Sequence, residues 1–174
     1  MNSRAFLMND LEGSKYKLTY VHNPQRWSDN LIASDNPIRN IENWSKEIKY
    51  LNESNSAISN AIKKLPNNVG GIYMFYIKGI NLPFIENYIL YIGRCQYTGT
   101  QNIRKRAREY FKDKRDLIKA MFKLWGEHLY YRYFPDTDNE AIIQNEVQLI
   151  RAIVPYFNET IPDKIEIKPT VPAF

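Results

Sequence analysis

Two stretches near the middle of the chain have the residue pattern of β-strands. Residues 71–77 and 87–92 are rich in β-branched and aromatic side chains, and a loop of about ten residues containing glycine and proline separates them. The pattern predicts an antiparallel hairpin with a long connection. The same reasoning predicts another strand over 128–134 and, from a weaker alternation, one over 16–21.

Apolar residues recur at helical spacing elsewhere in the chain. Helices are expected over 38–51, 56–64, 103–111, 117–125 and 140–154. From residue 71 onward the order is strand, strand, helix, helix, strand, helix. This order predicts a small α/β sandwich with a three-stranded, mainly antiparallel sheet flanked by helices, and not a doubly wound sheet. An N-terminal extension, mostly helical from residue 38, precedes it.

The composition is that of a folded protein. The chain has 174 residues, of which 44% are hydrophobic, a length that suits one domain with a sizeable core. It has one cysteine, so no intrachain disulfide can form, and this fits a cytoplasmic location. No apolar run reaches the roughly 18 residues of a membrane span, and the N-terminus has no signal-peptide pattern. We therefore expect no membrane association.

The positive charge is concentrated in one segment. The net charge is +5, but residues 104–123 contain nine Lys/Arg and three Asp/Glu, while the rest of the chain has a net charge of −1. A run of charge on a helix is most often a solvated face. Because the whole excess lies in one place, a surface that binds phosphate is the alternative.

Three local features raise chemical questions. Glu146 lies between two apolar rows of its predicted helix, where a carboxylate is costly unless it is paired, coordinated or able to reach the rim. Arg106 and Tyr110 are four residues apart and share a helix face, so they form either a phosphate grip or an ordinary surface pair. Tyr73 and Tyr91 occupy similar places in the two hairpin strands, where cross-strand tyrosines often only stabilise a sheet.

These residues fall within a recognisable pattern. Gly71-Ile72-Tyr73 followed by Tyr91-Ile92-Gly93 resembles the paired signature of the GIY-YIG nuclease family. Four further elements, in the family's order, resemble the domain entry, the helix with an essential arginine, the helix with a metal-binding glutamate and the closing asparagine: Leu65-Pro66, Arg106 with Tyr110, Glu146, and Asn158. The match covers about residues 65–158. It divides the chain into an extension (1–64), a nuclease domain (65–160) and a tail (161–174).

The resemblance implies hydrolysis of a DNA phosphodiester to 5′-phosphate and 3′-hydroxyl ends, with Mg²⁺ or Mn²⁺ held by Glu146. It implies that Arg106 neutralises the scissile phosphate and that Tyr73 positions or deprotonates the attacking water, with Tyr110 as the rival base. Tyr91 and Asn158 would be hydrogen-bonding supports. The expected DNA-binding residues are Arg94, Arg104, Lys105, Arg108, Lys112, Lys114 and Arg115.

The sequence departs from the family pattern in places. Seventeen residues separate Tyr73 from Tyr91, more than in compact members, and Arg94 stands where repair-type members have lysine. Insertions within the catalytic domain and the absence of a separate DNA-binding domain favour a restriction-type or host-defence enzyme, acting as a homodimer or higher oligomer. The alternatives are a structure-selective or repair nuclease, and a DNA-binding module on a degenerate nuclease scaffold.

Overall fold

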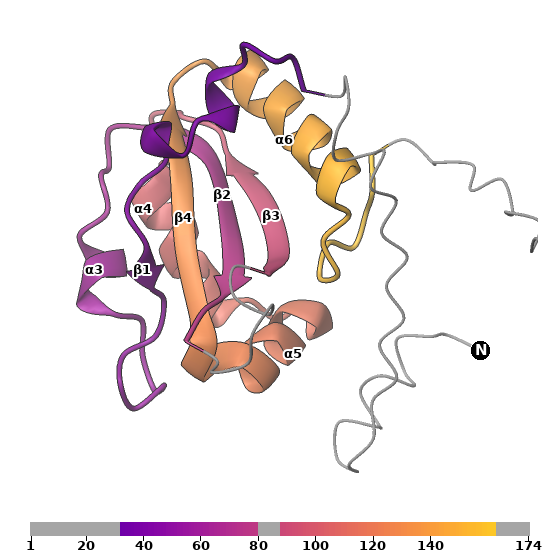
Figure 1. Cartoon of the computed structure of the whole chain (residues 1–174). Helices are drawn as coiled ribbons and strands as arrows, with labels where there is room; N and C mark the ends of the chain where they lie inside the picture. The colour runs from indigo at the N-terminus through magenta and orange to yellow at the C-terminus, as the bar shows by residue number, and fades with distance from the viewer. Residues whose placement is uncertain (1–31, 80–87, 163–174) are drawn as a thin grey trace, which may run out of the picture.

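The computed structural model describes residues 32–79 and 88–162 (Figure 1). Within them lie four strands, four α-helices and several short 3₁₀ turns. The strand predicted over 16–21, most of the hairpin connection and nearly all of the 161–174 tail lie outside the described residues. None of the described helices is both long and apolar enough to cross a membrane.

The sheet is antiparallel throughout. Its strands are β1 (Ile48–Lys49), β2 (Gly70–Ile77), β3 (Ile89–Cys95) and β4 (Leu129–Asp136), in the spatial order β1-β4-β2-β3. The predicted hairpin is confirmed as the β2–β3 pair, which leaves β3 at one edge of the sheet. The prediction of three strands is wrong, because β1 adds a fourth beside β4.

The main helices follow the predicted order. They are α4 (Ile103–Glu109), α5 (Asp116–Trp125) and α6 (Asn139–Ile153), while the helix predicted over 56–64 is only the short α3 (Asn60–Lys63). Their starts are local, since Asn102 and Asp138 each cap the following helix with a side-chain oxygen that accepts backbone N–H bonds. A 3₁₀ turn, η3 (Tyr110–Lys112), continues α4.

Each face of the sheet has its own hydrophobic core. Figure 1 shows α4 and α5 on one face and α6 across the other. Because side chains alternate along a strand, Tyr73 and Phe75 of β2 enter the first core, whereas Ile72 enters the second. The described part of the extension takes part in both cores, with Tyr50 in the first and Trp44 in the second.

The helix predicted over 38–51 does not form. The segment holds two 3₁₀ turns, η1 (Pro37–Arg39) and η2 (Ile41–Asn43), and then β1. Asn40 ends the first turn and its side chain caps the second, so the two cannot merge. Beyond them the backbone N–H of Ser45 bonds to the Tyr133 carbonyl at 2.8 Å, which joins the segment to β4. Tertiary pairing therefore outweighs the helical spacing of its apolar residues.

Candidate active site at the edge of the sheet

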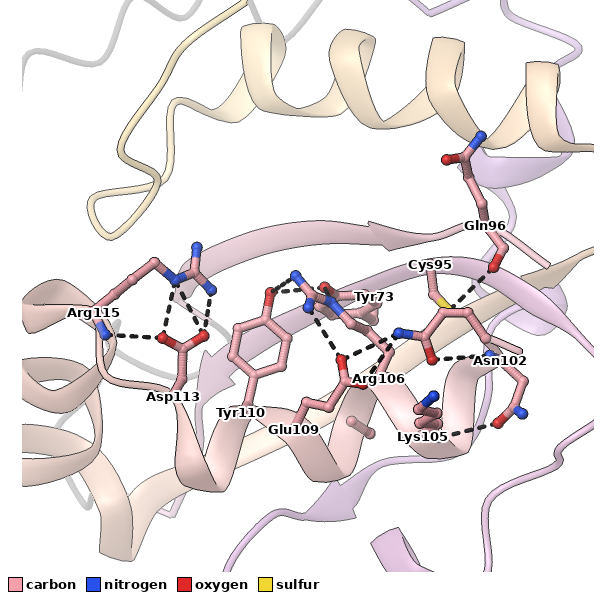
Figure 2. Close-up of polar contacts among 12 residues, drawn as sticks. Tyr73, Cys95, Gln96, Asn102, Lys105, Arg106, Glu109, Tyr110, Asp113 and Arg115 are labelled. Carbon is pink, nitrogen blue, oxygen red and sulfur yellow. Dashed lines mark hydrogen bonds and ion pairs between the residues drawn. The ribbon is translucent and has the colours of Figure 1, made fainter. Parts of the chain in front are cut away.

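Three tyrosines and an arginine meet beside β3. The Tyr73 and Tyr110 hydroxyl oxygens are 2.7 Å apart, and Tyr110 donates to Tyr91 at 2.9 Å. Arg106 donates through Nε to the Tyr73 hydroxyl at 3.1 Å and through Nη2 to the Tyr110 hydroxyl at 3.4 Å (Figure 2). The structure thus brings together four of the predicted site residues from β2, β3, α4 and η3.

The order of donors along this hydroxyl chain follows from proton counting. A phenol has one proton to donate. Since Tyr110 gives its proton to Tyr91, Tyr73 must donate to Tyr110, and the Tyr73 oxygen also accepts from Arg106. The three hydroxyls form a directed chain that begins at the arginine and ends at Tyr91.

Glycine at position 93 makes room for this arrangement. Gly93 lies opposite Tyr73 in the β2–β3 register, whereas Tyr91 lies opposite Phe75, so the two signature tyrosines are not a direct cross-strand pair. A Cβ atom at Gly93 would lie 2.6 Å from the Tyr73 hydroxyl oxygen. The signature glycine is therefore required by the packing of the Tyr73 ring.

The other signature glycine has a backbone reason. Gly71 has a φ of +132°, which side-chain-bearing residues rarely adopt, and a Cβ there would lie 2.0 Å from the Phe134 carbonyl oxygen on β4.

Arg106 is fixed from its other side by an acidic partner. Its Nη1 donates to Glu109 at 3.2 Å, and Gln101 donates to the same carboxylate. Its guanidinium carbon lies 4.9 Å from the centroid of the Tyr110 ring. The sequence analysis did not single out Glu109, although its i, i+3 spacing from Arg106 is a usable signal.

Burial sets the acidity of these tyrosines. Tyr73 is 0% exposed, Tyr110 1% and Tyr91 7%. Burial raises the pKa of Tyr73 well above that of a free phenol, the neighbouring tyrosines raise it further, and Arg106 opposes the rise. Burial likewise raises the pKa of Tyr91. In this conformation Tyr73 keeps its proton and is closed to solvent, which does not favour it as a general base.

Glu146 is held by an arginine on the α6 side of the same strand. Arg94 of β3 donates to its carboxylate and forms an ion pair with it. The Glu146 side chain is 12% exposed and that of Arg94 40%. Burial raises the pKa of Glu146, and the charges of Arg94 and Arg106 offset part of the rise. Pairing with an arginine was one of the two alternatives that the sequence left open for this glutamate.

Asn158 supports the same strand from outside. Its side-chain oxygen accepts from the Ile92 N–H at 2.9 Å, and its amide nitrogen donates to the Ile92 carbonyl at 2.7 Å. Both backbone groups lie on the free side of edge strand β3, so this asparagine replaces a missing neighbouring strand. This contact agrees with the supporting role expected of it.

The segment predicted to bind DNA does not form one surface. Arg115 donates to Asp113 through Nη2 at 2.7 Å, and its guanidinium carbon lies 5.6 Å from the Tyr110 ring centroid, so it belongs to the tyrosine cluster. Arg104 donates to the Leu65 carbonyl, whereas Lys105 donates to that of Thr100. The remaining members, Arg108, Lys112 and Lys114, are exposed.

A metal ion here would have few protein ligands. Within residues 32–79 and 88–162 no cluster of three or more His, Cys, Asp or Glu could hold a metal. Glu146 supplies a single, mostly buried carboxylate. This fits a hard ion such as Mg²⁺, which keeps most of its waters and uses one or two carboxylates together with substrate phosphate.

No family model, curated protein or solved structure matched this chain in the comparisons.

Proposed function

We propose that the protein is a metal-dependent DNA endonuclease of the GIY-YIG type that leaves 5′-phosphate and 3′-hydroxyl ends. The observation that carries the proposal is the convergence of Arg106 with Tyr73, Tyr91 and Tyr110, next to the Glu146–Arg94 pair across the edge strand. A phosphate at this edge would meet cationic donors on both sides of β3. Phosphodiester cleavage needs this kind of charge stabilisation.

Arg106 is the residue proposed to bind the scissile phosphate. Two of its nitrogens are tied to tyrosine hydroxyls and a third to Glu109, so the guanidinium is oriented before substrate arrives. Its side chain is still 32% exposed, which leaves surface for an anion. Preorganised donors cost little to reorient during reaction, and arginine suits phosphate oxygens geometrically.

The buried tyrosines are proposed to hold Arg106 and to relay hydrogen bonds. Either Tyr73 or Tyr110 can act as general base only if substrate binding opens the cluster to a water molecule. The pH dependence of cleavage by Tyr73→Phe and Tyr110→Phe separates these roles. A lost alkaline limb identifies the base, whereas a uniform decrease identifies a support.

Glu146 is proposed to hold one Mg²⁺ or Mn²⁺, which would supply charge neutralisation and a more acidic bound water. Arg94 already pairs with this carboxylate, so it has to move aside as the site is loaded. Because the Arg94 side chain is 40% exposed, it can turn towards a phosphate instead. In this proposal Arg94 contacts the DNA backbone.

The test is cleavage of supercoiled plasmid with Mg²⁺ or Mn²⁺. Glu146→Gln and Arg106→Ala should each lower the cleavage rate by roughly 100-fold or more, as loss of a group that stabilises transition-state charge does. Glu140→Gln, an exposed glutamate on the same helix, is the matched control and should cut normally. Normal cleavage by Glu146→Gln would contradict the proposal. If Arg104→Ala is inactive and Arg106→Ala active, the essential arginine has been misassigned.

The products and the substrate range test the finer points. Fragments should be rejoined by DNA ligase without prior phosphorylation. Discrete fragments from plasmid support a restriction-type or host-defence enzyme, whereas cutting of branched or damaged DNA alone supports a structure-selective or repair nuclease. Binding without cleavage in both metals supports the degenerate module. A homodimer or higher oligomer is expected for double-strand cutting and is measurable by sedimentation.

A further inference from the structure

A groove of about 600 Å³ lies on the outer side of α4, separate from the tyrosine cluster. One wall comes from residues 57–67 and the other from α4 and η3. Its lining residues are Ala57, Ile58, Asn67, Asn102, Arg104, Lys105, Arg108, Glu109, Phe111 and Lys112. We call this hollow the α4 groove.

The charge of the α4 groove is strongly positive. It is lined by four cationic side chains and one carboxylate, that of Glu109. Glu109 is already engaged by Arg106 and Gln101, so it neutralises little of the groove. Arg108 and Lys112 are exposed and have no side-chain hydrogen bond or ion pair within the part of the chain that the structure describes. Such a surface favours a polyanion.

The floor of the groove is apolar and includes an exposed aromatic ring. Phe111 is 41% exposed, although it directly follows the buried Tyr110. Ala57 and Ile58 supply further apolar surface across from it. A single exposed ring on a protein surface needs no explanation. A ring set among unpaired cations inside a groove matches the way proteins bind unpaired nucleic acid, with bases stacked on aromatics and the backbone on Lys and Arg.

We propose that the α4 groove binds an unpaired strand of DNA, with one base stacked on Phe111 and the adjoining phosphates beside Arg108 and Lys112. An intact duplex does not offer this contact, because its base faces are covered by their neighbours in the stack. The proposal rests on the proposed function only in taking DNA as the polymer. Because Glu109 both lines the groove and pairs with Arg106, a strand in the groove lies next to the candidate active site.

Fluorescence anisotropy with a labelled single-stranded oligonucleotide, and with a hairpin duplex of the same sequence, tests the proposal. The full chain is used with EDTA, so that cleavage plays no part. Phe111→Ala should weaken binding of the single strand by roughly tenfold, within the range for loss of one stacked base, and binding of the duplex by less than about twofold. Phe111→Trp should bind the single strand like the wild type.

The matched control is Ile41→Ala, which removes another exposed apolar side chain, 57% exposed and outside the groove. It should bind both oligonucleotides normally. The pair Arg108→Ala and Lys112→Ala should lower the salt slope of single-strand binding by about two. Thermal melting of each variant verifies that it is folded.

Three results would overturn the inference: a wild type that does not bind the single strand, a Phe111→Ala variant that binds it normally, and equal weakening for single strand and duplex. These outcomes are separable from the proposed function. Loss of cleavage in Glu146→Gln with normal anisotropy for Phe111→Ala refutes the groove alone. Binding that depends on Phe111 in a protein that never cuts DNA refutes the nuclease alone.

Discussion

Replacing Gly93 with alanine should test the packing of the candidate site with a single methyl group. The new Cβ would lie 2.6 Å from the Tyr73 hydroxyl oxygen and 2.8 Å from Cζ, whereas ordinary contact begins near 3.4 Å. The ring must therefore retreat by about 0.8 Å, the difference between these distances. It has no free space, because Tyr73 is 0% exposed and stacks on Tyr131 with ring centroids 5.6 Å apart.

The expected cost has two parts. Overpacking a filled core costs about 1 to 3 kcal/mol. Displacing the ring also weakens the 2.7 Å bond between the Tyr73 and Tyr110 hydroxyls, and a hydrogen bond contributes about 1 kcal/mol. The free energy of unfolding should fall by about 2 to 4 kcal/mol, which lowers Tm by roughly 5 to 15 °C in a chain of this length. Arg106 loses its alignment, so DNA cleavage should drop about 100-fold.

Urea denaturation and plasmid cleavage measure the two effects. Gly99→Ala is the matched control, because a Cβ there meets no atom within 4 Å. Tyr73→Phe provides a second variant, since it removes the hydroxyl that the new methyl group strikes first. The Gly93→Ala/Tyr73→Phe double variant should therefore lose less stability than the sum of the single losses. A Gly93→Ala protein as stable and as active as Gly99→Ala would refute the described packing.

Three further variants probe neighbouring contacts. Tyr110→Phe removes the hydroxyl in the middle of the chain and should lower the free energy of unfolding by about 1 to 3 kcal/mol in urea titrations; an unchanged midpoint would contradict this. Asn158→Ala leaves the Ile92 backbone groups without their side-chain partner and should cost about 1 to 2 kcal/mol, whereas Asn158→Asp, which keeps the acceptor, should lose less. Asp113→Asn tests pH dependence. Arg115 lowers the pKa of Asp113 from its ordinary 3.8, so the stabilisation by its charged form is complete above that value and is lost as the pH falls through the lower folded-state value. The pair is partly exposed and should contribute less than about 1 kcal/mol at neutral pH, and wild type and variant should converge in acid unfolding experiments.

Local signals predicted much of the fold. The order of elements from β2 to α6 is confirmed, because strand alternation and helical spacing are visible within a few residues and capping side chains mark where helices begin. The helix predicted over 38–51 fails for the opposite reason. β1 has only two residues and exists because it pairs with β4, some eighty positions later in the chain.

The candidate site divides in the same way. The sequence could place Arg106 and Tyr110 on one helix face, because a spacing of four residues is a local property. It could not show that Tyr73 lies opposite Gly93, since strand register is set by pairing. The basic segment was read as one surface, yet Asp113 draws Arg115 back to Tyr110, while Arg108 and Lys112 line the α4 groove.

The sequence by itself determined the order of most elements, the concentration of positive charge and the residue types available for phosphate chemistry. Only the tertiary structure decided which of them meet. The Tyr73–Tyr110 hydrogen bond spans 37 positions and the Arg94–Glu146 pair 52. The physical reason is that helical periodicity and capping involve neighbours in the chain, whereas contacts of this length depend on how the two hydrophobic cores pack around edge strand β3.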